Sequence, residues 1–83
     1  MKHTLKCWPA YFEAIEHGIK TFDVRKNDRG VMGFAVGDTL TFEEWHPGAK
    51  EYTGNVSAGW RVCYVLRDFP GIEPGYCVMG IER

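Results

Sequence analysis

The chain has 83 residues, a formal net charge of −1 at pH 7, 45% hydrophobic residues and 25% charged residues. This length suits a single domain, residues 1–83, with a modest core, and the composition is typical of a folded globule rather than a disordered chain. The near-zero net charge excludes a protein that binds long duplexes mainly through overall positive charge, because such binding grows with the number of phosphates neutralised.

The first part of the chain predicts a strand and a short helix. Apolar and polar residues alternate from His3 to Trp8, which is typical of a half-buried strand. A helix over Pro9–His17 is expected next, because Pro9 suits the first helical position and Phe12 and Ile15 lie on one face. Gly18 supplies the left-handed residue that ends such a helix.

The residues after the helix change to a period of two, which predicts a second strand. Its apolar face comprises Phe22 and Val24, and its polar face comprises Thr21, Asp23 and Arg25. We therefore expect an apolar face with a charged back, where Lys20, Asp23 and Arg25 converge as a small anion-binding group. The alternative is a solvated Asp23–Arg25 ion pair that contributes well under about 1 kcal/mol.

The middle of the chain predicts turns, a connector and one well-defined strand. Asn27–Gly30 has turn chemistry, and Val31–Val36 is a connector with enough apolar residues to lie on the body. Leu40 and Phe42 alternate with polar residues, which predicts a half-buried strand. Trp45–Gly54 is expected to be a loop in which aromatic residues stand among small ones.

The last part of the chain predicts two more strands. Gly59–Asp68 alternates, with one face comprising Trp60, Val62, Tyr64 and Leu66 and the other comprising Arg61, Cys63, Val65 and Arg67. Gly75–Ile81 is apolar on both faces, which suits a central strand covered on each side. About five strands with one or two short helices predict an α+β fold, a small and mostly antiparallel β-barrel.

Cysteine usage and hydropathy indicate a cytoplasmic protein. Cys7, Cys63 and Cys77 are odd in number, widely spaced and set in apolar runs, which predicts reduced thiols in the core. A zinc site would need His3, Cys7, His46 and Cys63 to converge, and the spacing does not favour it, so neither a metal nor a cofactor is expected. No apolar run approaches the roughly 18 residues of a membrane span, and no secretion leader is expected.

The sequence Gly18-x-Lys20-x-x-Asp23-x-Arg25 resembles the G-x-K-x-x-E-x-R signature of ASCH domains, small relatives of the PUA RNA-binding fold. The likeness covers nearly the whole chain, from the opening His3-Thr4-Leu5-Lys6 to the closing Gly75–Ile81, and points to an uncharacterised phage and bacterial family. Asp23 stands where the signature has glutamate, and its side chain is one methylene shorter. The resemblance implies a PUA-like barrel.

The resemblance also implies that Lys20, Asp23 and Arg25 line a cleft between barrel and helix that holds nucleic acid or a modified base. We therefore expect an RNA-binding domain whose cleft takes a flipped or single-stranded nucleotide. Its additional candidate contacts are the cations Lys26 and Arg29 and the stacking side chains Trp8 and Trp45. For the two tryptophans core packing is the alternative.

Two other functions are open at this point. Some ASCH relatives are hydrolases that act on acetylated cytidine or RNA, which makes Lys20, Asp23, Thr21 and Glu43 the candidate catalytic residues. The relatives' lysine matches Lys20, but their threonine corresponds to Asp23, and Thr21 is displaced by two positions. The other alternative is a protein-interaction module of phage origin. The sequence does not indicate an oligomeric state.

Overall fold

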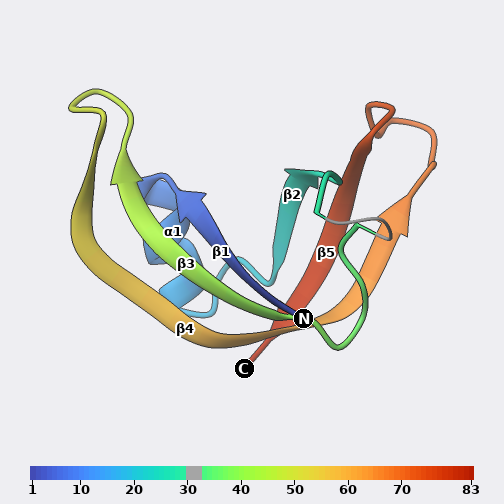
Figure 1. The fold of residues 1–83 in the computed structure, drawn as a ribbon, viewed down its shortest axis with the longest axis horizontal. Coiled ribbons are helices and arrows are strands. Elements are labelled where there is room, and N and C mark those ends of the chain that lie inside the picture. The colour runs from blue at the N-terminus through green and yellow to red at the C-terminus, as the bar shows by residue number, and fades with distance from the viewer. Residues whose placement is uncertain (30–32) are drawn as a thin grey trace.

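The computed structural model describes residues 1–29 and 33–83, and in these residues five strands form one curled sheet beside a short helix (Figure 1). The elements in chain order are β1 (Lys2–Cys7), α1 (Pro9–Glu16), β2 (Phe22–Lys26), β3 (Thr39–His46), β4 (Glu51–Arg67) and β5 (Tyr76–Glu82). The strand order across the sheet is β1-β3-β4-β5-β2, with β1 parallel to β3 and every other pair antiparallel. The sheet is a half-barrel, so the expected small, mostly antiparallel α+β fold is confirmed without full closure.

Helix α1 begins and ends close to the predicted residues. Pro9 occupies the first turn, and the helix stops one residue early, with His17 as its C-cap. Gly18 follows with a φ of +73°, the left-handed conformation predicted for it, and its N–H donates to the carbonyl of Ile15 at 3.0 Å. Phe12 and Ile15 are buried in the core and the helix packs against β3, which compensates for the marginal stability of so short a helix.

The core fills the concave side of the sheet. The predicted alternation holds in β1, where every second residue is buried, and in β3, where Leu40 and Phe42 are fully buried. In β5 the side chains of Cys77, Met79 and Ile81 are buried, whereas those on the outer face are only half-buried. The prediction that β5 is an interior strand is confirmed, but the prediction that both faces are covered is wrong.

A β-bulge in β4 reverses the predicted sidedness of this strand. Val62 pairs with Ile81 and Tyr64 pairs with Gly80, so one extra residue lies in β4 between these pairs. Trp60 and Val62 are buried as expected, but Tyr64 is 62% exposed and Val65 packs against the core instead. The prediction that Tyr64 and Leu66 share a face with Val62 is wrong, because a period-two pattern changes side at a bulge.

The predicted loop from Trp45 to Gly54 is mostly a β-hairpin. Strand β3 continues to His46 and β4 begins at Glu51, eight residues before the predicted start at Gly59. Trp45 pairs with Tyr52 across this hairpin. The loop prediction is wrong because the small residues near position 54 accompany a register shift in a continuous strand rather than its end.

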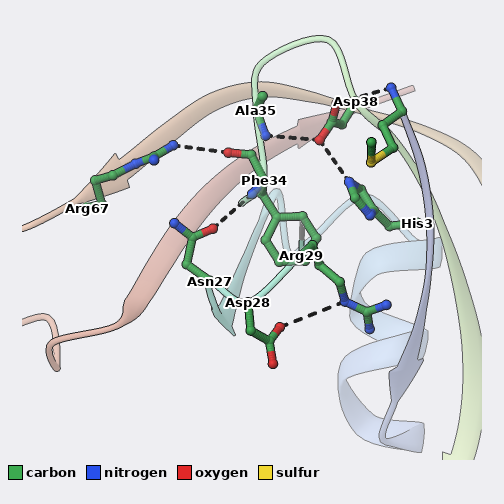
Figure 2. Close-up of polar contacts among 9 residues, drawn as sticks. His3, Asn27, Asp28, Arg29, Phe34, Ala35, Asp38 and Arg67 are labelled. Carbon is green, nitrogen blue, oxygen red and sulfur yellow. Dashed lines mark hydrogen bonds and ion pairs between the residues drawn. The ribbon is translucent and has the colours of Figure 1, made fainter. Parts of the chain in front are cut away.

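A polar network holds the end of the connector before β3 (Figure 2). The N–H of Phe34 donates to Asn27 Oδ1 at 2.9 Å, and Arg67 Nη2 donates to the carbonyl of Phe34 at 3.0 Å. Asp38 accepts from the N–H of Ala35 at 3.0 Å and lies 2.8 Å from His3 Nε2. The predicted turn at Asn27–Gly30 and connector at Val31–Val36 lie partly outside the described residues.

Two remaining expectations concern thiols and membranes. Cys7 and Cys77 are buried as predicted, but Cys63 is exposed beside the β4 bulge, so its predicted place in the core is wrong. The helix in the described part of the chain has eight residues, and no helix there is long enough to cross a membrane.

Candidate functional site

Strand β2 places its charged residues inward and its apolar residues outward. Asp23 is 5% exposed, whereas Phe22 and Val24 are 46% and 52% exposed. The expected period of two is confirmed, but the alternative of a solvated Asp23–Arg25 pair is wrong because the carboxylate is buried. Asp23 and Arg25 can face inward because β2 is an edge strand, where inward side chains find polar partners from neighbouring segments.

The Asp23 carboxylate binds two cations, one at each oxygen. Lys20 Nζ donates to Oδ1 at 3.2 Å, and Arg25 Nε donates to Oδ2 at 2.6 Å. Lys20 also donates to the carbonyl of Phe22 at 2.8 Å, and Arg25 Nη2 donates to the carbonyl of Lys6. The buried negative charge is therefore fully paired, and the three groups together carry one net positive charge.

These three residues meet at one pocket of about 320 Å³, where the end of β1, the first turn of α1 and β2 come together. Its lining includes Cys7, Trp8, Tyr11, Lys20, Asp23 and Arg25. This volume lies within the range of about 300–1,000 Å³ that is usual for small-ligand sites. The pocket combines apolar walls with a few convergent polar groups, which is the usual composition of a binding site.

An aromatic pair borders the pocket. The rings of Trp8 and Tyr11 are stacked, with centroids 6.0 Å apart and planes 18° apart. Both side chains are about half exposed, and they stand three residues apart at the start of the helix. The Lys20 ammonium lies 5.8 Å from the Tyr11 ring centroid and 4.9 Å from that of Phe22. The pocket therefore has a flat apolar border next to a cation.

Cys7 contributes an apolar lining rather than a nucleophile. Burial, with a further effect of the Asp23 carboxylate, raises the pKa of the Cys7 thiol to about 11. The thiol is therefore protonated at neutral pH, and only a thiolate attacks electrophiles efficiently. This wall of the pocket is chemically inert.

The other predicted nucleic-acid contacts lie outside this pocket. Lys26 and Arg29 line a neighbouring cavity of about 350 Å³, and Arg25 borders both cavities. Arg29 Nε lies 3.9 Å from Asp28 Oδ1 (Figure 2). Trp45 lies on the β3–β4 hairpin, where the Lys6 ammonium is 4.6 Å from its ring centroid.

Two of the predicted catalytic residues do not line the pocket. The side chain of Thr21 is exposed, and its main-chain carbonyl accepts from the N–H of Ile81 at 3.0 Å. Glu43 lies on β3, opposite Lys6 in the parallel register. Only Lys20 and Asp23 of the four candidates belong to the pocket lining.

Sequence reasoning missed four residues of the lining, which are Lys6, Cys7, Tyr11 and Val24. Cys7 was expected only as a core thiol, Lys6 only as a polar strand position and Val24 only on the apolar face of its strand. No site role was predicted for Tyr11. The spacing of Trp8 and Tyr11 was the available clue, because residues three apart on a helix are neighbours. The closeness of β1 to β2 has no counterpart in local sequence.

The next feature is the set of side chains that could ligate a metal ion in the described residues. Residues 1–29 and 33–83 contain no group of three His, Cys, Asp or Glu side chains placed to hold a metal ion. His3 faces Asp38, and Nδ1 of His46 accepts from the N–H of Ala49 at 3.1 Å. The two histidines considered for a zinc site therefore have different partners.

Comparison with known proteins gives one family. A family model described as a domain of unknown function, DUF3850, matches residues 2–81. The match includes all of β1, α1 and β2, so it contains every residue that lines the pocket. The search of curated proteins finds no significant match.

Proposed function

The chain belongs to the DUF3850 family, and we propose that it is an RNA-binding domain whose pocket takes one nucleotide of a single strand. The nucleobase stacks on the exposed Trp8–Tyr11 pair, and Lys20 and Arg25 bind its phosphate. The observation that carries this proposal is the convergence of Lys20, Asp23 and Arg25 at a pocket bordered by stacked rings. The resemblance of the Gly18-to-Arg25 motif to ASCH domains supports the same ligand class.

The two cations keep hydrogen-bond donors for a phosphate. An ammonium group has three N–H donors and a guanidinium has five. Lys20 uses two of its donors on Asp23 and Phe22, and Arg25 uses two on Asp23 and Lys6. Asp23 therefore acts as a positioning residue: it holds both cations in place before the ligand arrives, which reduces the ordering cost of binding.

A single strand fits these features better than a duplex does. Specific RNA recognition mostly uses unstacked bases that lie on aromatic side chains, and each such stack contributes about 1–3 kcal/mol. The net charge of −1 gives no general attraction to phosphates, so affinity depends on the pocket itself. All three cysteines are free, which suits the reducing cytoplasm.

The hydrolase alternative has no specific support in the geometry. The Lys20 ammonium is bound to the Asp23 carboxylate, and Thr21 and Glu43 lie outside the pocket lining. A lysine that activates a hydroxyl must stand within hydrogen-bond reach of it. Hydrolysis of acetylated cytidine or RNA stays a prediction that rests on the resemblance alone.

Titration of fluorescently labelled single-stranded RNA into the protein at low salt tests the proposal. We expect the double variant Lys20→Ala/Arg25→Ala to bind at least about tenfold more weakly than wild type, because charge-assisted bonds to phosphate contribute roughly 1.5–3 kcal/mol each. Lys2→Ala is the matched control, since Lys2 is an exposed strand lysine outside the pocket. Equal binding by the double variant, or no binding by wild type, overturns the proposal.

A further inference from the structure

We infer that the pocket continues onto the β3–β4 hairpin, where Lys6, Trp45 and Tyr52 form a second nucleotide subsite. The ligand is then a single strand of several nucleotides rather than a free nucleotide. This inference rests on the proposed function and extends it, because it specifies the length of the ligand and names residues outside the pocket's cation group.

The hairpin residues form a cation–aromatic cluster. Trp45 and Tyr52 are directly opposite each other across the antiparallel pair. The Lys6 ammonium lies 4.6 Å from the Trp45 ring centroid and 5.9 Å from that of Tyr52. The Tyr52 side chain is about half exposed, so a flat surface with a cation above it faces the solvent.

Lys6 joins this cluster to the pocket. Its main-chain carbonyl accepts the hydrogen bond of Arg25, and the residue is part of the pocket lining. Its side chain stands on the opposite side of β1 from that of buried Cys7 and reaches the hairpin rings. Lys6 therefore connects the two places, with its main chain at the pocket and its ammonium at the hairpin rings.

A cation lies beside a pair of aromatic rings both at the pocket and at the hairpin. Lys20 lies beside Tyr11 and its partner Trp8, and Lys6 lies beside Trp45 and Tyr52. Proteins that bind single strands with little sequence preference combine stacking rings with cations that follow the phosphate backbone. A single nucleotide in the pocket does not contact the hairpin rings, whereas the next base of a strand can stack on them.

The charge of Lys6 is available for such a strand. Among residues 1–29 and 33–83, no carboxylate lies within ion-pair distance of the Lys6 ammonium. The nearby Glu44 carboxylate instead accepts from Thr53 Oγ1 at 2.6 Å and from Asn55 Nδ2 at 3.0 Å. Neither Glu43, which is opposite Lys6 in the β1–β3 register, nor Glu44 therefore forms an ion pair with the lysine that lies over the hairpin rings.

A length series tests the inference. Uridine monophosphate and oligouridylates of two, four and eight nucleotides compete with a labelled oligouridylate for wild type. A tetranucleotide can place any of its bases in one pocket, so a gain of up to about fourfold over the monophosphate is statistical. We expect a gain of at least about tenfold, because each additional stacked base strengthens binding.

Single substitutions in the hairpin show which residues cause the higher affinity for the tetranucleotide. We expect Trp45→Ala and Tyr52→Ala each to lower tetranucleotide affinity at least about fivefold and to leave monophosphate affinity unchanged. Tyr52→Ala is the safer variant for folding, since this side chain is the more exposed of the two. Tyr64→Ala is the matched control, because Tyr64 is an exposed tyrosine of the same strand and no lysine of the described residues lies over its ring.

The outcomes separate the two proposals. Wild type that binds the monophosphate and the tetranucleotide with affinities within about fourfold of each other overturns the inference but not the pocket. Unchanged tetranucleotide affinity in both folded hairpin variants also overturns the inference alone. Wild type that binds neither ligand overturns the proposed function together with the inference.

Discussion

The guanidinium of Arg25 on β2 donates a hydrogen bond to the main-chain carbonyl of Lys6 on β1, 19 positions away in sequence. These two strands are the opposite edges of the sheet, and its curl brings them face to face across the open side of the half-barrel (Figure 1). The candidate pocket lies beside this contact and takes its lining from both edges. Arg25 therefore links the stability of the open side to the geometry of the site.

Replacement of Arg25 should affect stability as well as binding. We expect Arg25→Ala to lower the free energy of unfolding by about 1–3 kcal/mol, because it removes two charge-assisted hydrogen bonds and leaves Asp23 with one cation. Arg25→Lys should recover only part of this loss, since a single ammonium lacks the fork that spans both acceptors. Urea denaturation measures the loss, with the exposed neighbour Lys26→Ala as the control. An Arg25→Ala variant that is as stable as wild type contradicts the bridging role.

Asp23 should tolerate glutamate better than asparagine. In Asp23→Asn the negative charge between Lys20 and Arg25 is lost, and two like charges remain beside each other. We expect a loss of about 3 kcal/mol, the lower end of the range for breaking a buried pair, because both cations are partly exposed. Asp23→Glu keeps the negative charge between the two cations, so its loss should be smaller. Denaturant midpoints compare the two variants, and the reverse order contradicts the pairing.

Low pH should lower the stability of the folded protein, partly through protonation of Asp38. Burial raises the pKa of this carboxyl, but hydrogen bonds from His3, the Ala35 N–H and the N-terminus outweigh it and hold the pKa below its usual range. A folded-state pKa below the unfolded value contributes stability above about pH 4, which is lost as pH falls through the folded value. We expect Asp38→Asn to be less stable than wild type at pH 7 and to lose less stability between pH 5 and pH 3.

Urea midpoints between pH 3 and pH 7 check this prediction. Some acid sensitivity should persist in the variant, because hydrogen bonds from Ser57 and Arg83 also lower the pKa of Glu16. Parallel pH profiles for wild type and Asp38→Asn contradict the assignment of this effect to Asp38.

The three thiols should react in a fixed order. Cys63 is exposed, whereas burial raises the pKa of Cys77 and, together with Asp23, raises that of Cys7 to about 11. At pH 8 we expect iodoacetamide to modify Cys63 at least about tenfold faster than the other two, because the thiolate is the reactive form. Mass spectrometry of peptides follows each site, and urea should make the three rates similar. Fast modification of Cys7 in the folded protein contradicts its burial and its raised pKa.

Strand β2 shows where local pattern is informative and where it is not. The alternation of Phe22, Asp23, Val24 and Arg25 predicted a strand, and the strand is present. The side that faces inward could not be derived from it, because burial of Asp23 depends on Lys20, Arg25 and the edge position of the strand. In β4 the same kind of pattern was correct up to Val62 and wrong after it, because a one-residue bulge is invisible to periodicity.

The sequence alone determined the short helix between Pro9 and Gly18, the strand character of most segments and the grouping of Lys20, Asp23 and Arg25. These features depend on backbone preferences and on spacing along one element, which neighbouring residues control. Only the tertiary structure decided that the sheet stays open, that Asp23 is buried, and that Lys6 lies between the pocket and the hairpin rings. Those features depend on the curl and register of strands far apart in the chain, and no local pattern encodes which edges meet.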